Sequence, residues 1–182
     1  MARVEGRLLE RIQELAAIDE ALRTARAGQG ALMLVDGPPG IGKTELLTAA
    51  ITRARGRRMR VLVARGGELE LSFPFAVVRQ LFEPAVTRAE DAVRDRLLEG
   101  AAVHAATVVD PRAASGPAVV EASAVLHGLY WLTANLAADR PLLLVIDDLH
   151  WSDPASIDLV GALLRRGQSA PVLLVLAYRP GQ

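Results

Sequence analysis

The feature that most constrains the fold of this 182-residue chain is a glycine-rich octapeptide, GPPGIGKT, at residues 37–44. It matches the pattern G-x-x-x-x-G-K-[ST] at every fixed position, and a chance match at a given position is on the order of 1 in 10⁴ to 10⁵. An apolar run, Ala31 to Val35, precedes it, and a helix-forming stretch, Glu45 to Arg55, follows it. A strand, a glycine loop and a helix in this order predict a parallel α/β sheet.

The residue types of the octapeptide suit the binding of a nucleoside triphosphate with Mg²⁺. Glycines let the backbone turn its N–H groups toward phosphate oxygens, and the following helix adds its positive N-terminal dipole. Lys43 can place an ammonium on the β- and γ-phosphates, and Thr44 can supply a hydroxyl ligand to Mg²⁺. The alternative is a strand–helix turn with a chance lysine. The predicted phosphate-binding residues are Gly37, Pro38, Pro39, Gly40, Ile41, Gly42, Lys43 and Thr44.

The composition of basic residues supports a function for this lysine. Lysine and arginine together number 21, and Lys43 is the only lysine among them. The guanidinium of arginine is wide and planar and cannot take the place of a compact ammonium. This difference explains why a lysine is retained at this one position. Ras-like GTPases read guanine with an Asn-Lys-x-Asp motif, and no lysine remains to form one. We therefore expect ATP with Mg²⁺ rather than GTP.

Two acids follow a second apolar run in the segment LLLVIDDLHWSD, residues 142–153. They lie where a buried strand ends, and ligands of open α/β sheets bind at this edge. We assign Asp147 to Mg²⁺ and Asp148 to activating or orienting the attacking water; the alternative is a solvated loop. Arg179 follows a further apolar run and is predicted to sense the γ-phosphate, unless it is a surface arginine. Asp153 is interpreted as a helix N-cap.

The remaining patterns predict alternating helices and strands. Helices are expected over 8–27, 45–55, 74–100 and 119–138 and from Pro154 onward, and strands over 31–35, 61–64, 142–146 and 172–177, with a loop over 110–117. Buried strands that alternate with helices imply a parallel sheet covered on both faces. The predicted fold class is therefore α/β, a P-loop NTPase three-layer α/β/α sandwich with a mainly parallel sheet.

Composition excludes several classes of function. There is no cysteine, so disulfides, thiolate zinc sites and cysteine nucleophiles are excluded, and the three histidines have no metal-ligand spacing. The N-terminal residues lack the apolar core of a signal peptide, and the apolar run 142–146 is too short to cross a bilayer. We expect a cytoplasmic chain without membrane association. The formal net charge is zero, so the arginines between 53 and 60 are interpreted as cations at a helix C-terminus rather than a nucleic-acid surface.

Four sequence blocks together resemble the N-terminal ATPase domain of the large ATP-binding LuxR-type bacterial transcriptional regulators, which belong to the AAA+-related STAND ATPases. Leu8 to Leu15 is similar to the family segment LLEREAEL, with Ile12 in place of glutamate. Phe73 to Pro84 is similar to FPFGVVRQLFEP, and DDLHWSDPAS (147–156) and LAYRPG (176–181) resemble two further blocks. The resemblance covers almost the whole chain.

The resemblance implies site residues and a domain organisation. Residues 37–44 correspond to the Walker A motif and residues 142–148 to the Walker B strand, with Asp148 as its second acid. Residues 172–181 correspond to the sensor-1 region, with Arg179 as the sensor arginine. Leu9 and Arg11 correspond to a segment near the adenine and ribose. The resemblance implies a partial core over 1–182, truncated after the fourth strand and lacking the lid, the regulatory region and the helix-turn-helix.

Three functions remain open at this stage. The leading hypothesis is an ATP-binding switch with slow hydrolysis, a weak ATPase, that binds ATP and ADP and controls transcription through parts outside this segment. DNA would be bound only by an absent C-terminal domain, and the incomplete sheet edge could be masked in a homo-oligomer. The second hypothesis is a P-loop small-molecule kinase or stand-alone ATPase, although no acceptor motif is found. The third, a non-catalytic scaffold or DNA-binding protein, conflicts with the intact P-loop.

Overall fold

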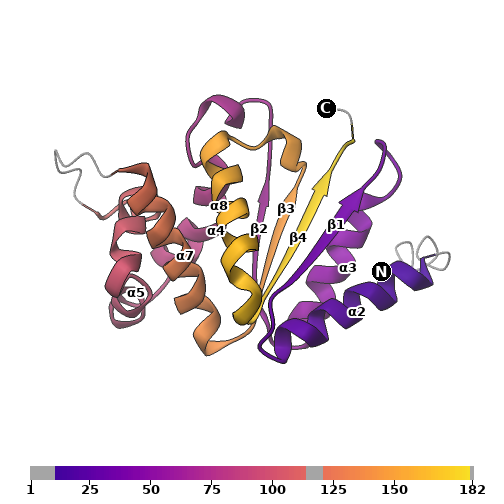
Figure 1. The fold of residues 1–182 in the computed structure, drawn as a ribbon, viewed down its shortest axis with the longest axis horizontal. Helices are drawn as coiled ribbons and strands as arrows, with labels where there is room; N and C mark the ends of the chain where they lie inside the picture. Colours follow the sequence, from indigo (N-terminus) through magenta and orange to yellow (C-terminus); the bar gives the residue numbers. More distant parts are fainter. Residues whose placement is uncertain (1–10, 114–120, 181–182) are drawn as a thin grey trace.

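A parallel sheet of four strands forms the centre of the computed structural model, which describes residues 11–113 and 121–180 (Figure 1). The strands are β1 (Ala31–Asp36), β2 (Arg60–Arg65), β3 (Leu142–Asp147) and β4 (Val172–Tyr178). Their order in the sheet is β1-β4-β3-β2, and all three pairings are parallel. The predicted α/β class and parallel sheet are therefore confirmed.

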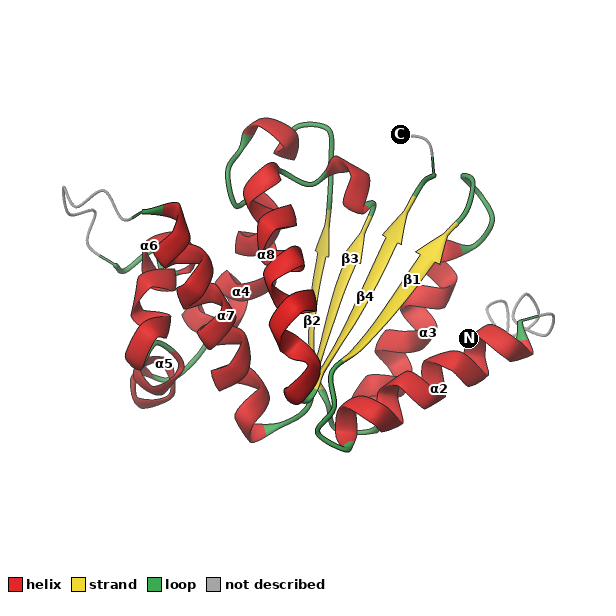
Figure 2. Cartoon of the chain, in the orientation of Figure 1, coloured by secondary structure: helices red, strands yellow, loops and turns green. Residues whose placement is uncertain are grey.

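Helices cover both faces of this sheet, which gives three layers (Figure 2). One face carries α2 (Ile12–Arg26) and α3 (Lys43–Gly56), and the other carries α4 (Ala76–Thr87) and α8 (Pro154–Arg166), with α7 (Ala122–Asp139) packed against α8. The smaller helices α5 (Asp91–Leu97) and α6 (Ala106–Val109) complete the α4–α7 side, together with the 3₁₀ turns Glu70–Ser72, Gly100–Ala105, Leu149–Trp151 and Gly167–Ser169.

The central strand β3 explains why the sheet is buried on both faces. All six of its residues are buried. Successive side chains of a strand point to opposite faces, so Leu142, Leu144 and Ile146 belong to the core under α4, α7 and α8. Leu143 and Val145 belong to the core under α2 and α3. The continuous apolar run of residues 142–146 therefore forms a strand that helices cover on both faces.

The stretch 74–100 is largely helical, as expected, but it is divided into two helices. The structure has α4 and α5 in this region, separated by a turn at residues 88–90. The apolar stripe of Val77, Val78, Leu81 and Phe82 is correct and is buried. Val93 and Leu97 of α5 join the same core, so the apolar spacing continues across the turn although the helix does not.

Other boundaries agree closely, and some lie outside the described residues. The part of the expected first helix that is described is α2, and Leu9 lies outside the described residues. The predicted loop 110–117 is described only to residue 113, and the start of the helix expected at 119 falls partly in the same gap, since α7 begins at Ala122. Among the described residues no helix is long and apolar enough to pass through a bilayer.

Strand β1 is an edge of the sheet. Among the described residues it pairs only with β4. Leu32 is 44% exposed and Leu34 is 54% exposed, although both lie on the face that α8 covers elsewhere. The edge strand therefore carries unpaired backbone groups and an apolar surface, which are features that favour pairing with another strand.

Candidate nucleotide site

The glycine-rich loop lies at the carboxyl end of β1 and leads directly into α3 (Figure 1). Gly42 caps this helix with φ 91°, a left-handed conformation that favours glycine. A Cβ at this position would lie 3.1 Å from a guanidinium nitrogen of Arg11. The loop therefore leads directly into the N-terminus of α3, so that the loop and the helix can both offer N–H groups to a phosphate.

Lys43 is buried within this loop. Only 8% of its surface is exposed, and its ammonium donates hydrogen bonds to the carbonyl oxygens of Gly37 and Pro38, the latter at 3.1 Å. No carboxylate pairs with it among the described residues. A buried ammonium with carbonyl partners alone fits an anion, since a phosphate would supply the missing opposite charge.

Thr44 and Asp147 meet across two strands. The hydroxyl of Thr44 donates to a carboxylate oxygen of Asp147 at 3.5 Å, although the residues are 103 positions apart. Parallel strands end at the same edge of a sheet, and this brings the end of β3 beside the start of α3. No cluster of three or more acidic, histidine or cysteine side chains suited to a metal occurs in the described ranges. The Thr44 hydroxyl and the Asp147 carboxylate together suit Mg²⁺, because this ion is usually held by few protein ligands together with phosphate and water.

Asp148 is hydrogen-bonded to one arginine and lies beside a second. One of its oxygens accepts hydrogen bonds from Nε and Nη2 of Arg65, at 3.1 and 2.9 Å. The other lies 3.7 Å from Nε of Arg179. Asp148 itself is 6% exposed and has φ 51°, a left-handed conformation unusual for a residue with a side chain. The hydrogen bond to Asp148 raises the pKa of Arg65, so the guanidinium of Arg65 stays charged at neutral pH.

The backbone of Arg65 is fixed by Gln80 of α4. The amide oxygen of Gln80 accepts from the Arg65 N–H at 3.0 Å, and its amide nitrogen donates to the Arg65 carbonyl at 3.1 Å. The next residue, Gly66, approaches β3 so closely that a Cβ would lie 2.5 Å from the Asp148 carbonyl oxygen. The ends of β2 and β3 are therefore locked together behind the guanidinium that holds Asp148.

Arg179 lies between Asp148 and the phosphate loop. With Pro38, Pro39 and Pro180 it lines a cavity of about 330 Å³, and it also lines the open hollow between Arg65 and Asp148. Its Nε is buried and makes no hydrogen bond with the described residues. A buried guanidinium nitrogen without a partner, next to a phosphate loop, fits an additional phosphate oxygen.

Arg11 contacts the same loop from α2's side. Its guanidinium donates to the Ile41 carbonyl. A cavity of about 420 Å³ between α2, β1 and the loop is lined by Arg11, Met33, Ile41 and Lys43 among others. Its size and mostly apolar wall are typical of small-molecule sites. Leu9, the other residue expected near the base, lies outside the described residues.

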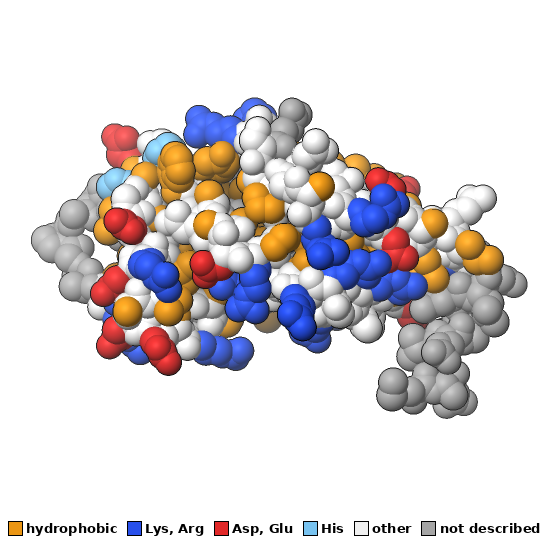
Figure 3. Space-filling view, turned by 90° about the horizontal axis from the view of Figure 1, so that it is seen from below, with side chains coloured by type: hydrophobic (Ala, Val, Ile, Leu, Met, Phe, Trp, Pro, Cys, Tyr) orange, Lys and Arg blue, Asp and Glu red, His pale blue; other side chains and the backbone are white. Residues whose placement is uncertain are grey.

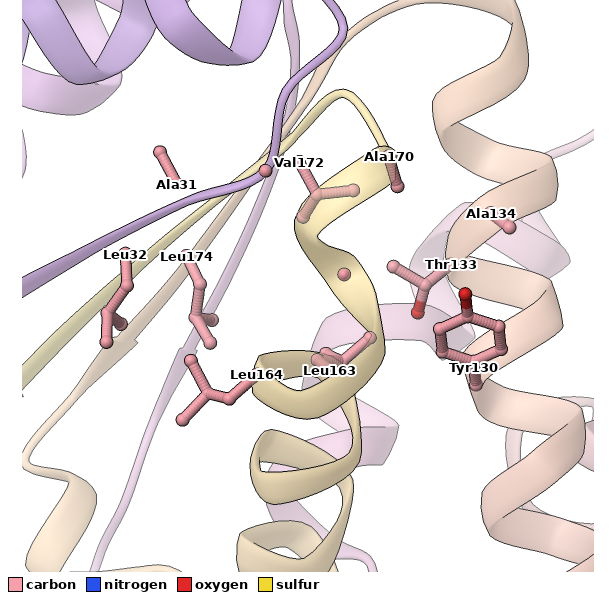
Figure 4. Close-up of a pocket in the computed structure, with 12 residues that line it drawn as sticks. Ala31, Leu32, Tyr130, Thr133, Ala134, Leu163, Leu164, Ala170, Val172 and Leu174 are labelled. Carbon is pink, nitrogen blue, oxygen red and sulfur yellow. The ribbon is translucent and has the colours of Figure 1, made fainter.

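A further cavity, about 390 Å³, lies on the other side of the sheet (Figure 4). It is bounded by α7, α8 and the starts of β1 and β4, and its wall is almost entirely apolar, including Leu32, Leu163, Leu164 and Leu174. No charged side chain lines it. It is therefore no site for phosphates, and it lies beside the exposed edge strand rather than the glycine-rich loop.

Sequence reasoning missed Arg65 and Gln80. Arg65 is one of 20 arginines, and its position at a strand end is a signal only once β2 is known to pair with β3. Trp151 lines the hollow beside Asp148, whereas both ring nitrogens of His150 are buried without a partner among the described residues.

Asp153 is an N-cap, as its sequence context indicates, but it caps two helices. Its carboxylate accepts from the Ser156 N–H at 3.0 Å at the start of α8. It also accepts from the N–H groups of Phe75 at 2.7 Å and Val77 at 3.5 Å, at the start of α4. This fully buried carboxylate therefore joins two segments that are distant in sequence.

Comparison with known proteins gives three matches. The family model described as AAA ATPase domain matches residues 7–175. An uncharacterized protein of Rhizobium meliloti is 29% identical over 205 residues, covering 98% of this chain and 19% of that protein. A chain in the structure of Drosophila ORC bound to AT-rich DNA and Cdc6 is 15% identical with a TM-score of 0.49, covering 98% of this chain and 50% of that one.

The chain thus spans about a fifth of the length of its bacterial relative. The matched family model begins before α2 and ends within β4, and it includes the glycine-rich loop and the two acids at the end of β3. Both the fold and the convergence of Lys43, Thr44 and Asp147 at one sheet edge agree with a nucleotide-binding P-loop NTPase. This chain belongs to the AAA ATPase domain family.

Proposed function

We propose that this chain is an ATP-binding switch domain with slow hydrolysis, and that it belongs to a LuxR-type transcriptional regulator. The observation that carries the proposal is the state of Asp148, whose carboxylate is held by Arg65 and flanked by Arg179. A carboxylate that accepts two hydrogen bonds from one guanidinium and lies beside a second is a poor base for water. Such a site binds a nucleotide firmly and hydrolyses it slowly, as a switch requires.

The phosphates are proposed to lie on the loop of residues 37–44. Lys43 would turn from the carbonyls of Gly37 and Pro38 to the β- and γ-phosphates, and Thr44 with Asp147 would hold Mg²⁺. Bound Mg²⁺ neutralises phosphate charge during transfer. Arg179 would donate its unpartnered Nε to the γ-phosphate, so its contacts differ between ATP and ADP. The adenine and ribose are assigned to the cavity beside Arg11, with Leu9 as the proposed neighbour.

The regulator assignment is supported by the two sequence blocks that Asp153 joins. The block around Phe73–Pro84 and the block 147–156 resemble LuxR-type regulators, and the hydrogen bonds from Phe75, Val77 and Ser156 to Asp153 hold them together. This contact gives a physical reason for both blocks to occur in one chain. Any DNA binding is assigned to other parts of the regulator.

A small-molecule kinase is the second candidate, and it needs a polar acceptor pocket next to the γ-phosphate. The cavity of Figure 4 is apolar and lies at the opposite end of β1. The hollow beside Asp148 is open and is bordered by arginines. Neither observation favours an acceptor site, so the switch is the better supported function.

Titration with Mg-ATP and Mg-GTP tests the nucleotide assignment. We expect the wild-type chain to prefer ATP and Lys43→Ala to weaken ATP binding at least tenfold, about 1.4 kcal/mol. Arg79→Ala serves as the matched control, because Arg79 is an exposed cation on α4 away from the loop. Equal affinity of the wild type and Lys43→Ala would refute the phosphate site, and a preference for GTP would refute the base assignment.

A further inference from the structure

The sheet edge opposite the nucleotide site collects arginines. Helices α2, α3, α7 and α8 each lead into the start of a strand, so their C-terminal ends meet at this edge (Figure 1). Viewed from below, basic side chains gather near the middle of this face (Figure 3). The arginines in these helix ends and the adjoining turns are Arg23, Arg26, Arg53, Arg55, Arg57, Arg58, Arg60, Arg140, Arg165 and Arg166.

Helix dipoles explain only part of this gathering. A cation in the last turn of a helix is favoured by the negative end of the dipole, which accounts for Arg26, Arg53 and Arg166. Arg58, Arg60 and Arg140 lie beyond the helix ends. Arg58 also has φ 59°, a conformation that favours glycine or asparagine at this position after a helix. Arg140 is the C-cap residue of α7, so the local helices leave only Arg58 and Arg60 without an explanation.

Arg60 is crowded by another cation. It begins β2, its N–H donates to the Pro141 carbonyl at 2.8 Å, and Arg140 is the residue before that proline. Burial and the charge of Arg140 lower the pKa of Arg60, and Asp139, whose carboxylate lies 3.9 Å away, does not compensate. Nη1 of Arg60 is buried without a hydrogen bond to the described residues. The one carboxylate beside this crowded guanidinium therefore does not balance the positive charge around it.

The carboxylates near this edge are already engaged. Asp19 pairs with Arg53 and Arg57, and Asp139 pairs with Arg60. In the described part of the chain Arg55, Arg58 and Arg140 make no ion pair, and all three are exposed. The edge therefore has a local excess of positive charge, although the chain as a whole is neutral.

We propose that the cluster of Arg58, Arg60 and Arg140 docks an acidic segment of a partner protein. Guanidinium forks bind carboxylates in pairs of parallel hydrogen bonds, and the side chains of Arg58 and Arg140 are exposed to accept a partner. The surface lies at the end of the sheet remote from Lys43, so a docked segment leaves the nucleotide site open.

An acidic protein segment fits this surface better than a nucleic acid. Duplex binding draws on many phosphate contacts and on a basic surplus, whereas this chain has no net charge and the cluster is small. Single strands use aromatic platforms, and residues 55–60 and 139–142 contain no aromatic side chain. The arginine contacts that this edge already makes are with carboxylates.

Fluorescence anisotropy with a labelled oligoglutamate peptide at low ionic strength tests the proposal. We expect the Arg58→Gln/Arg140→Gln double variant to bind the peptide about tenfold more weakly than the wild type. The control double variant Arg88→Gln/Arg96→Gln removes the same charge from exposed residues around α4 and α5, and we expect it to bind like the wild type. Both variants should bind Mg-ATP normally, which separates this surface from the nucleotide site.

Three results would overturn the docking surface. They are absence of peptide binding by the wild type, equal losses in the two double variants, and tighter binding of duplex DNA through the same two arginines. Thermal melting without peptide excludes a merely structural role. Removing Arg140 relieves the repulsion on Arg60, so the melting temperature should stay equal or rise, and a marked fall would assign these arginines to folding instead.

Discussion

At the scale of single residues, the contact between Arg65 and Asp148 decides how the candidate site behaves. Asp148 lies where a water-activating acid is expected, yet its carboxylate accepts two hydrogen bonds from Arg65. Gln80 fixes the backbone of Arg65, and the close approach of Gly66 leaves that segment little freedom. Release of Asp148 therefore requires movement of the Arg65 side chain, which is 69% exposed and free to swing outward.

Replacement of Arg65 should speed hydrolysis. We expect Arg65→Gln to raise the single-turnover rate of ATP hydrolysis roughly threefold or more, because Asp148 loses the partner that competes with water. The affinity for Mg-ATP should change little, since Arg65 does not contact the loop of residues 37–44. Quench-flow measurement of phosphate release reports the rate directly.

Asp148→Asn is the companion variant. It should keep ATP binding and lower the same single-turnover rate about 100-fold, if Asp148 acts on the attacking water. An unchanged rate in Asp148→Asn would remove this residue from the reaction. A slower rate in Arg65→Gln would mean that Arg65 orients Asp148 productively rather than restraining it.

At the scale of elements, Asp153 and Ser156 connect α4 to α8. The Asp153 carboxylate caps both helices, and the Ser156 hydroxyl donates to Asp153 at 2.6 Å while accepting from the Val78 N–H at 3.2 Å. The first turn of each helix leaves N–H groups unpaired, and burial makes their partners important. Two helices thus depend on one carboxylate.

Loss of this double cap should be costly. We expect Asp153→Ala to lower the free energy of unfolding by about 2–4 kcal/mol, because it removes two helix caps and leaves buried donors unpaired. Asp158→Ala is the control, since Asp158 is exposed on the same helix, and it should change stability by less than about 0.5 kcal/mol. Urea unfolding measures both, and equal effects would contradict the double cap.

At the scale of the whole molecule, the sheet is well covered on both faces but open along β1. Leu32 and Leu34 of β1 are exposed, and β1 pairs with only one other strand among the described residues. The nucleotide site and the arginine cluster lie at opposite ends of the same strands. A ligand at either end would therefore contact strands that belong to the same hydrophobic core.

Mg-ATP should stabilise the whole fold by mass action. At a concentration a hundredfold above Kd the gain is about 2.7 kcal/mol, which raises the melting temperature of a domain of this size by about 5–10 °C. Differential scanning fluorimetry with and without Mg-ATP measures this shift. Lys43→Ala is the control and should lose most of it at the same nucleotide concentration; an equal shift would place the nucleotide elsewhere.

The open edge predicts concentration-dependent association. We expect Leu34→Lys to reduce self-association of the chain in sedimentation velocity, because a charge on the exposed face of β1 disfavours strand pairing. Leu69→Lys is the control, since Leu69 is 85% exposed away from this edge. Equal sedimentation of both variants and the wild type at all concentrations would argue against a homo-oligomer formed through β1.

The sequence by itself determined the glycine-rich loop, the four strands and the acids at the end of β3. These features depend on neighbouring residues, because a strand alternates its faces, a loop needs its glycines and a cap needs the residues just after it. The convergence of Thr44 and Asp147 followed from topology, since parallel strands end at one edge. Local pattern therefore sufficed for the core of the candidate site.

Only the tertiary structure decided which side chains share a contact. Arg65 and Asp148 are 83 positions apart and meet because β2 pairs with β3. Asp153 reaches α4 across 78 positions, and Arg140 comes beside Arg60 for the same topological reason. No spacing in the chain encodes these contacts, because each depends on strand order and on how closely two elements pack.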